Sequence, residues 1–513
     1  MLDDRDVGGA LAFAEGLQSE PAFYADQLLA IACTEGGPIL NRRDLIERGA
    51  GLWRKLNPEA SGIVAYNLAN AEQGIWELAV REKDIALAWE QDRQHLRSAR
   101  QTFLRVAHDD NESDELRAQA FTNAGNSYDI LGRDLDSLAC YDAAIDLDAS
   151  FAMAYGNRGI TLLHVAPFMG EHRGGVFRQA AAALDEALSR QDDVMRVGGP
   201  AALTHFKTER ASIRISEAEA RSEGCQQVRL DDPYLDWCLR NQLFLHVSHD
   251  CIREDTQDLD AIYFRGLTAG TVEDERTRVE DLAEAFNAVK QAFAATRYLT
   301  WLATDSTSPI REHARAVSRR VYYADPLTYG RYGTRTGIAI QALAGAVDVL
   351  DKIAGFVHLY LRTGRQRDVY FSSIARKRRR GSPLTPEIAA AFVKPERNRG
   401  LLALCDLSED LEDDTLLRRL TNLRHTATHR FLVIHSIMPG TSNAWLDHLG
   451  WDELVMGLHQ QLAIARGAVV YLARVIDIHE NLDRRSAAGG GFTVTFPLER
   501  ADTDLEEWDS GSA

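Results

Sequence analysis

The feature of this chain that most constrains its fold is an internal repeat. The pattern of aromatic and small residues at positions 121–128 returns 34 residues later, at positions 155–159. Asn123 and Asn157 occupy the same place in the two copies, and Asn67 occupies it in a degenerate copy further upstream. Short helical units that repeat at a fixed period cannot bury their apolar faces alone, so about three stacked units are needed for a stable core.

A second set of small and aromatic residues recurs in the segments that follow each copy. Small residues let one helix approach its partner closely, and an aromatic ring fills the space between them. With the 34-residue period, this pattern is typical of tetratricopeptide repeats; the alternative is an ordinary helical bundle with accidental periodicity. Because a helical solenoid usually binds a partner, we expect a protein or peptide regulator on the repeats. The recurring sets are Ala99, Phe103 and Val106; Ser137, Tyr141 and Ala144; and Ala180, Leu184 and Ala187.

The second half of the chain has the apolar spacing of long helices. Residues at three- and four-residue intervals predict helices over about 283–301, 338–361, 415–437 and 451–481. Four long helices joined in sequence favour an antiparallel four-helix bundle. The fold class expected from the whole sequence is therefore all-α, with a short solenoid followed by a bundle.

Changes of pattern along the chain predict five regions. These are an N-terminal helical region with the degenerate repeat (1–110), the repeats (111–230), a helical junction (231–310), the bundle (311–485) and a tail (486–513). The tail begins with a glycine-rich linker, continues into a strand-like run at 492–496 and ends in acidic residues.

The composition limits where the protein works. The net charge is −18, so the protein as a whole does not coat nucleic acid, and RNA would need a local basic patch. Its six cysteines are scattered, which fits a reducing cytosol better than a disulfide framework. The N-terminus lacks the apolar core of a signal peptide, and no long uncharged apolar stretch predicts a membrane span. We therefore expect a cytoplasmic protein that does not contact a membrane.

One short segment carries most of the chemistry that the sequence offers. Arg424 is followed by His425, and after three further residues by His429 and Arg430. Histidine exchanges protons near neutral pH, and the planar guanidinium of arginine suits a phosphate. We therefore expect Arg424, His425 and His429 to be catalytic residues.

Three other interpretations of this segment are open: a metal site, structural histidines, and an overlapping register in which Arg418 or Arg419, seven and six residues before His425, takes the place of the arginine. His425 and His429 lie one helical turn apart, as in a zinc-binding helix, but no glutamate lies between them and no third ligand is evident, so no metal is expected. Isolated histidines are usually structural, although the flanking arginines disfavour protonation unless an anion is present. On a helix, Arg424 and His429 would be separated by about 140°, which favours a site shared between two subunits.

A basic segment precedes the motif. Residues 362–399 contain eleven bases and three acids. A charge run is most often only solvated, but here it adjoins the candidate active site in an acidic protein, which favours phosphate contacts. We predict that Arg376, Lys377, Arg378, Arg379, Arg380 and Arg430 bind RNA.

Other enzyme classes lack their sequence motifs in this chain. It has no Gly-x4-Gly-Lys-Ser/Thr phosphate-binding loop, no Gly-x-Ser-x-Gly nucleophile elbow and no dinucleotide-binding glycine pattern after a strand.

Residues 424–430 resemble the Arg-Asn-x3-His-Arg pattern of the HEPN superfamily (higher eukaryotes and prokaryotes nucleotide-binding), with His425 in place of the usual asparagine. Residues 237–239, 349–354 and 398–401 show further similarity. The resemblance covers about 230–480, and is to a bacterial branch in which tetratricopeptide repeats precede a C-terminal HEPN domain.

The resemblance implies a metal-independent, cofactor-free endoribonuclease that forms a homodimer, or a higher oligomer, through its HEPN domain. Such proteins often serve as toxins or anti-phage, abortive-infection effectors. His429 would be the acid/base and Arg424 the phosphate clamp, while His425 would assist or only bind phosphate. The expected reaction is attack of a ribose 2′-hydroxyl on the adjacent phosphate. The alternative function is a non-catalytic scaffold that binds RNA or protein.

Overall fold

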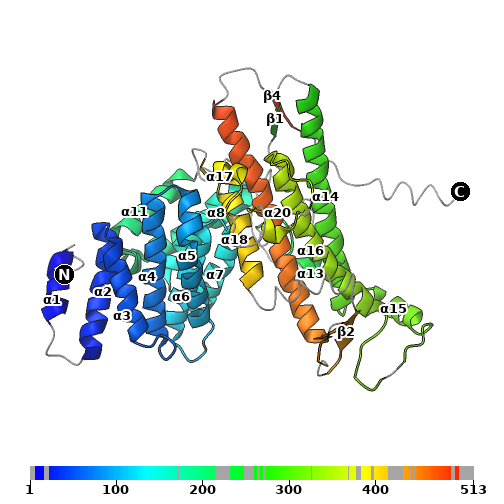
Figure 1. The fold of residues 1–513 in the computed structure, drawn as a ribbon, viewed down its shortest axis with the longest axis horizontal. Coiled ribbons are helices and arrows are strands. Elements are labelled where there is room, and N and C mark those ends of the chain that lie inside the picture. The colour runs from blue at the N-terminus through cyan, green and yellow to red at the C-terminus, as the bar shows by residue number, and fades with distance from the viewer. Residues whose placement is uncertain are drawn as a thin grey trace.

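The computed structural model has the all-α architecture that the sequence predicts. It describes residues 6–16, 22–169, 173–213, 232–247, 259–260, 262, 266–269, 273–324, 326–367, 369–376, 383–393, 398–413, 431–437, 441–443, 445–486 and 492–495. An N-terminal series of paired helices leads into a bundle of longer helices (Figure 1). None of the helices in these described ranges is long and apolar enough to cross a membrane.

The N-terminal half is a solenoid of antiparallel helix pairs, in which each helix packs on its neighbours in sequence. The prediction of paired, stacked helices is confirmed, although the assignment of the repeats to the tetratricopeptide type stays a prediction. The helices are α1 (Val7–Gly16), α2 (Ala22–Leu40), α3 (Arg43–Lys55), α4 (Gly62–Glu82), α5 (Ile85–Ala107), α6 (Asp114–Ile130), α7 (Asp134–Leu147), α8 (Ala152–Val165), α9 (Arg173–Ser189), α10 (Gln191–Val197) and α11 (Gly199–Ser212).

Small residues set the spacing within the pairs. A Cβ atom on Gly125 of α6 would lie 2.5 Å from the ring of Tyr141 on α7. In the next pair, a Cβ atom on Gly159 would lie 2.7 Å from the side chain of Leu184. The buried rings and branched side chains therefore occupy space that only glycine leaves open, as the sequence pattern predicts.

Asparagines link successive pairs. Asn123 donates through Nδ2 to Oδ1 of Asn70 at 3.0 Å, and Asn157 donates in the same way to Asn126 at 2.8 Å. Tyr141 donates its hydroxyl to the same Oδ1 atom of Asn126 at 2.9 Å. These bonds satisfy partly buried amides between neighbouring units, so they help to fix the register of the stack.

The C-terminal half is a bundle of α14 (Glu273–Thr304), α16 (Thr334–Tyr360), α18 (Arg399–Asp413) and α20 (Trp451–Ser486). The shorter helices α13 (Pro233–Arg240), α15 (Ile310–Ser318) and α17 (Pro386–Val393) surround it. The helices predicted over 283–301, 338–361 and 451–481 are confirmed. Because α14 belongs to the bundle, the bundle begins within the segment predicted as a junction.

The helix predicted over 415–437 is wrong at its C-terminal end. Residues 431–435 form strand β2 (Phe431–His435), which pairs in parallel with β3 (Leu446–Gly450). The apolar run of β2 fits one face of a helix equally well, but β3 supplies backbone partners that a local pattern does not reveal. The fourth described helix of the bundle is α18.

A second strand pair closes the opposite end of the bundle from β2 (Figure 1). Strand β1 (Leu267–Ala269) pairs antiparallel with β4 (Phe492–Val494), which confirms the strand predicted at 492–496. The backbone N–H of Thr268 also donates to the carboxylate of Glu480 at 2.7 Å, tying this pair to α20.

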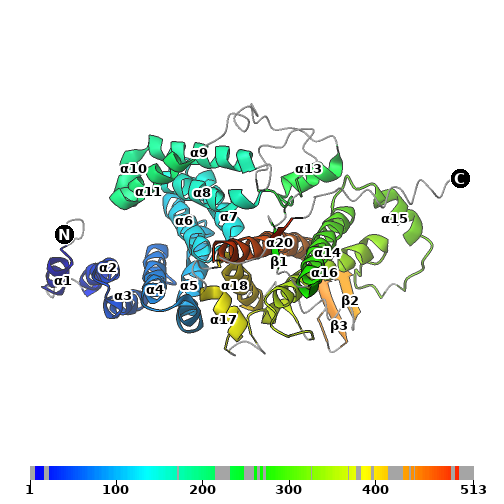
Figure 2. The same cartoon turned by 90° about the horizontal axis from the view of Figure 1, so that it is seen from above.

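The solenoid and the bundle share one continuous apolar core, in which Trp89 and Leu138 join Leu404 and Val469. Figure 2 shows α20 in the middle of the molecule, with the solenoid on one side and α14 and α16 on the other. At α18 and α20, Gly400 permits close approach, because its Cβ atom would lie 2.6 Å from the backbone nitrogen of Val475.

Buried ion pairs cross this boundary. Asp406 of α18 is fully buried, and it accepts from Arg133 of the solenoid at 2.9 Å and from Arg100 at 3.2 Å. Asp410 of the same helix accepts from Arg100 at 2.8 Å and from Arg97 at 3.2 Å, and it also pairs with Arg133. The three guanidinium groups are at most 4% exposed, so the two aspartates supply the negative charge that their burial requires.

Burial alone would raise the pKa of Asp410, but Arg100 and Arg133 hold that pKa below its usual range. A carboxyl group with a depressed pKa stabilises the folded state above its unfolded pKa of about 3.9. This contribution is lost as the pH falls below that value toward the folded pKa. The contact between the solenoid and the bundle is therefore weakened by strong acid.

The replacement Gly125→Ala should lower the free energy of unfolding by about 1–3 kcal/mol, because its methyl group overlaps the ring of Tyr141. Gly51→Ala is the matched control, since a Cβ atom there has no heavy atom within 4 Å and alanine favours a helix by up to about 1 kcal/mol. Urea unfolding would measure both. Equal stability of the two variants would contradict the close packing of α6 and α7.

Arg133→Met should cost about 3–5 kcal/mol, because it leaves Asp406 and Asp410 with less compensating charge in a buried place. Arg42→Met is the control, since Arg42 and its partner Asp44 are 55% and 63% exposed and the loss should stay below about 1 kcal/mol. Thermal unfolding and limited proteolysis would report the difference. A loss for Arg133→Met no larger than that of the control would be inconsistent with a stabilising buried network.

Candidate nucleic-acid interface

The residues predicted to be catalytic lie outside the described part of the chain. This holds for Arg424, His425, His429 and Arg430, and for the basic residues Lys377, Arg378, Arg379 and Arg380. The described chain ends before the motif with α18, at Asp413, and resumes after it with β2, at Phe431. The described residues next to the motif in sequence therefore belong to α18 and to the β2–β3 end of the bundle.

Arg376 is the one member of the predicted RNA-binding set whose side chain is described. It is 5% exposed, and its Nε and Nη2 atoms lie 3.1 and 3.0 Å from Oε1 of Glu409 on α18. Arg376 was predicted to contact phosphate at the surface. The structure does not support this role, because its guanidinium group is buried against Glu409. Its partner is 33 residues away in sequence, so the basic run alone could not reveal the pairing.

Strand β2 is held along both edges. On one edge it pairs with β3, in a register that places Phe431 beside Leu446 and His435 beside Gly450. On the other edge, Arg331 donates its backbone N–H to Ile434 at 2.6 Å, and the N–H of Ser436 donates to the carbonyl of Tyr329 at 3.0 Å. The strand that follows the motif is thus fixed between two other segments.

Two histidines meet on these strands. Nδ1 of His435 lies 2.8 Å from the carbonyl oxygen of Thr328, and its Nε2 lies 2.8 Å from Nδ1 of His448. A carbonyl oxygen only accepts, so in the neutral pair the proton of His435 is on Nδ1. Nε2 of His435 then accepts a hydrogen bond from Nδ1–H of His448. In His448, the nitrogen without a proton is therefore Nε2. The carbonyl of Thr328 thereby fixes the tautomers of both rings in the neutral pair.

Two arginines pack on Trp451, the first residue of α20, which directly follows β3. The guanidinium carbon of Arg331 lies 3.8 Å from the ring centroid of Trp451, and that of Arg335 lies 5.4 Å from it. Arg335 also donates to the carbonyl groups of Ala303 and Thr304 at the C-terminal end of α14, which otherwise lack helical partners. Burial, and the neighbouring positive charge of Arg331, lower the pKa of Arg335.

This end of the bundle thus brings together imidazoles that can exchange a proton and guanidiniums that attract an anion. Sequence reasoning centred on 424–430 and 362–399 did not identify these residues. The arginines could have been found from the sequence, because residues 311–335 contain six arginines and only two acids. The histidines gave no signal, since their pairing depends on parallel strands.

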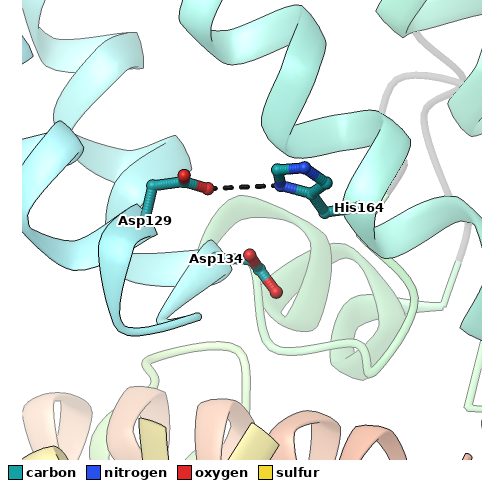
Figure 3. A group of neighbouring side chains, drawn as sticks. All are labelled: Asp129, Asp134 and His164. Carbon is teal, nitrogen blue, oxygen red and sulfur yellow. Dashed lines mark hydrogen bonds and ion pairs between the residues drawn. The ribbon is translucent and has the colours of Figure 1, made fainter. Parts of the chain in front are cut away.

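Three side chains at the boundary of the solenoid and the bundle have the composition of a metal site. Asp129, Asp134 and His164 place their ligand atoms within 4.8 Å of one another, and Figure 3 shows the bond between Asp129 and His164. However, Nη2 of Arg399 lies 2.9 Å from Oδ1 of Asp129, and Arg474 pairs with Asp134. Guanidinium groups already neutralise these carboxylates, so the cluster does not favour a metal ion.

The helices of the bundle match a known protein family. Residues 273–479 match the LA2681-like HEPN family, from the start of α14 into α20. The expected C-terminal HEPN domain is therefore supported, and the match includes the segment with Arg424 and His429. It begins before the predicted boundary at 311, because α14 is the first helix of the bundle. No curated protein matches the chain.

The histidine pair can be tested by 15N NMR on protein labelled at histidine, under conditions in which the ring nitrogens show neutral tautomers. His435 should carry its proton on Nδ1, because Thr328 accepts there. It should keep that tautomer in a His448→Phe variant. His313, exposed on α15, should instead show exchange between tautomers. A proton on Nε2 of His435 would contradict the assigned direction of both bonds.

Proposed function

We propose that the chain is a metal-independent endoribonuclease and that its HEPN domain cleaves RNA. The observation that carries the proposal is the family match over 273–479, because HEPN domains are generally nucleases and the matched segment contains the Arg424-x4-His429 pattern. The concentration of arginines at 311–335, within the same matched segment, adds support, since RNA binding in an acidic protein requires a local basic surface.

In the proposed reaction, His429 removes the proton of a ribose 2′-hydroxyl, and the resulting oxygen attacks the adjacent phosphorus. Arg424 stabilises the negative charge that develops on the phosphate oxygens. The bond from phosphorus to the 5′-oxygen breaks, and that oxygen takes up a proton. The products are a 2′,3′-cyclic phosphate and a 5′-hydroxyl end, with no oxidant, metal or cofactor consumed. His425 assists the proton transfer or contacts the phosphate.

The proposal also covers the oligomeric state, the regulation and the biological role of the enzyme. Two copies would meet through their HEPN domains and share Arg424 and His429, and the solenoid would bind a protein or peptide regulator. We place the activity in the cytoplasm, as a toxin or anti-phage effector. The paired helices of the solenoid support the regulatory role, because stacked repeats usually recognise partners.

His429→Ala and Arg424→Ala should each lower the rate of RNA cleavage by about 100- to 10,000-fold, because each removes a group that acts on the transition state. The measurement is release of cyclic-phosphate ends from total RNA by the purified full chain, with EDTA present. Arg196→Ala should cleave at the parent rate, because Arg196 is 65% exposed on α10 and lies within the solenoid.

Cleavage by both motif variants at the parent rate would overturn the assignment of the catalytic residues. RNA retention by the parent chain without release of cyclic-phosphate ends would instead favour the alternative, a non-catalytic HEPN scaffold.

A further inference from the structure

The end of the bundle that carries α15, β2 and β3 exposes an unusual number of large apolar side chains. Tyr322 is 98% exposed, Leu327 83% and Tyr329 65%. From β2 and the residue before β3, Phe431 and Trp445 are 67% and 71% exposed. Figure 1 shows α15 and β2 at this same end of the molecule. Clustered exposed aromatics of this kind mark a binding surface more often than an ordinary solvated face.

The same surface is positively charged. Arg311 and Arg315 on α15, with Arg319 and Arg320 after it, are all exposed. With Arg331 and Arg335 and the two acids of this segment, residues 311–335 carry a net charge of +4, whereas the whole chain carries −18. Burial lowers the pKa of Arg335 most; Arg331, Arg311 and Arg315 lower it further, and Asp305 opposes them, as expected for charges that lie near one another.

The segment after α15 is built into a defined shape. At its base, the backbone N–H of Thr334 donates to the hydroxyl of Ser318 at 2.9 Å. Further out, the rings of Tyr323 and Tyr332 stack with their centroids 5.4 Å apart and an interplanar angle of 15°. The backbone N–H of Arg331 is also hydrogen-bonded to β2. The exposed tyrosines therefore lie on a loop whose two ends are fixed.

We propose that α15 together with residues 319–324 and 326–332 binds single-stranded RNA. The arginines would contact phosphates, and Tyr322 and Tyr329 would stack on unpaired bases. Single strands fit better than duplex RNA, because a base offers its face to an aromatic side chain only when it is unstacked. This inference rests on the proposed function for the identity of the nucleic acid, and it names the form of RNA and the residues that recognise it.

A second copy of the chain suits this surface less well. A twofold interface places the same patch against itself, so the four exposed arginines of one copy would face those of the other. Like charges across such a contact oppose association, whereas a polyanion neutralises them. The charge of the surface therefore favours RNA.

The experiment uses the full chain with His429→Ala, so that bound RNA is not cut, and a fluorescent 12-nucleotide single strand of mixed sequence. Adding Tyr322→Ala or Tyr329→Ala should weaken binding by about 5- to 150-fold, the effect of removing one stacked base. Tyr322→Phe should retain affinity because it keeps the ring. Tyr24→Ala, at an exposed position of α2, is the matched control and should bind as the parent does.

A double Arg311→Ala, Arg315→Ala variant should also flatten the dependence of log affinity on log salt by about 0.7 for each lost phosphate contact. Tyrosine and arginine variants that bind the strand as tightly as the parent would overturn the proposal. The proposal would also be overturned if these variants sedimented as monomers where the parent is a dimer, with unchanged affinity for RNA. The surface would then be an interface between copies of the chain.

Failure of this inference differs from failure of the proposed function. A chain that cleaves RNA but does not depend on these tyrosines or arginines overturns the inference alone. A chain that binds single strands through them but never releases cyclic-phosphate ends supports the inference and overturns the proposed nuclease activity.

Discussion

The rest of the structure depends on the buried charge between the solenoid and the bundle. Apolar contacts favour burial in any orientation, but an ion pair requires particular atoms to meet. Arg100 and Arg133 on one side and Asp406 and Asp410 on the other satisfy one another only in one arrangement. A different docking that left one of these charges buried without its partner would cost about 3–5 kcal/mol, so the network specifies how the two parts dock.

Helix α18 links this contact to the rest of the HEPN domain. Its Asp406 and Asp410 bind the solenoid, its Glu409 binds Arg376 within the bundle, and Gly400 brings it against α20. In sequence, α18 is also the last described helix before the motif. The helix that leads toward the proposed catalytic residues is therefore positioned by the solenoid as much as by its own bundle.

The local features of the fold could be predicted from the sequence, whereas those that depend on distant partners could not. The repeat and its small–aromatic packing were predictable because Gly125 and Tyr141 lie within one helix pair. The strand at Phe431–His435 was missed because β3 decides it, and the burial of Arg376 was missed because Glu409 decides it. For the candidate site, the sequence supplied the motif, and the structure added the histidine pair and the arginine–tyrosine surface.

The separation of charge along the molecule has a consequence for how partners approach it. An arginine-rich end on a chain of net charge −18 means that positive and negative charge are unevenly distributed over the protein. At physiological salt, where screening acts over about 8 Å, a polyanion is repelled by most of the surface and attracted at one end. The orientation of an incoming anion is therefore set by long-range steering before contact, and its association rate should fall as salt is added.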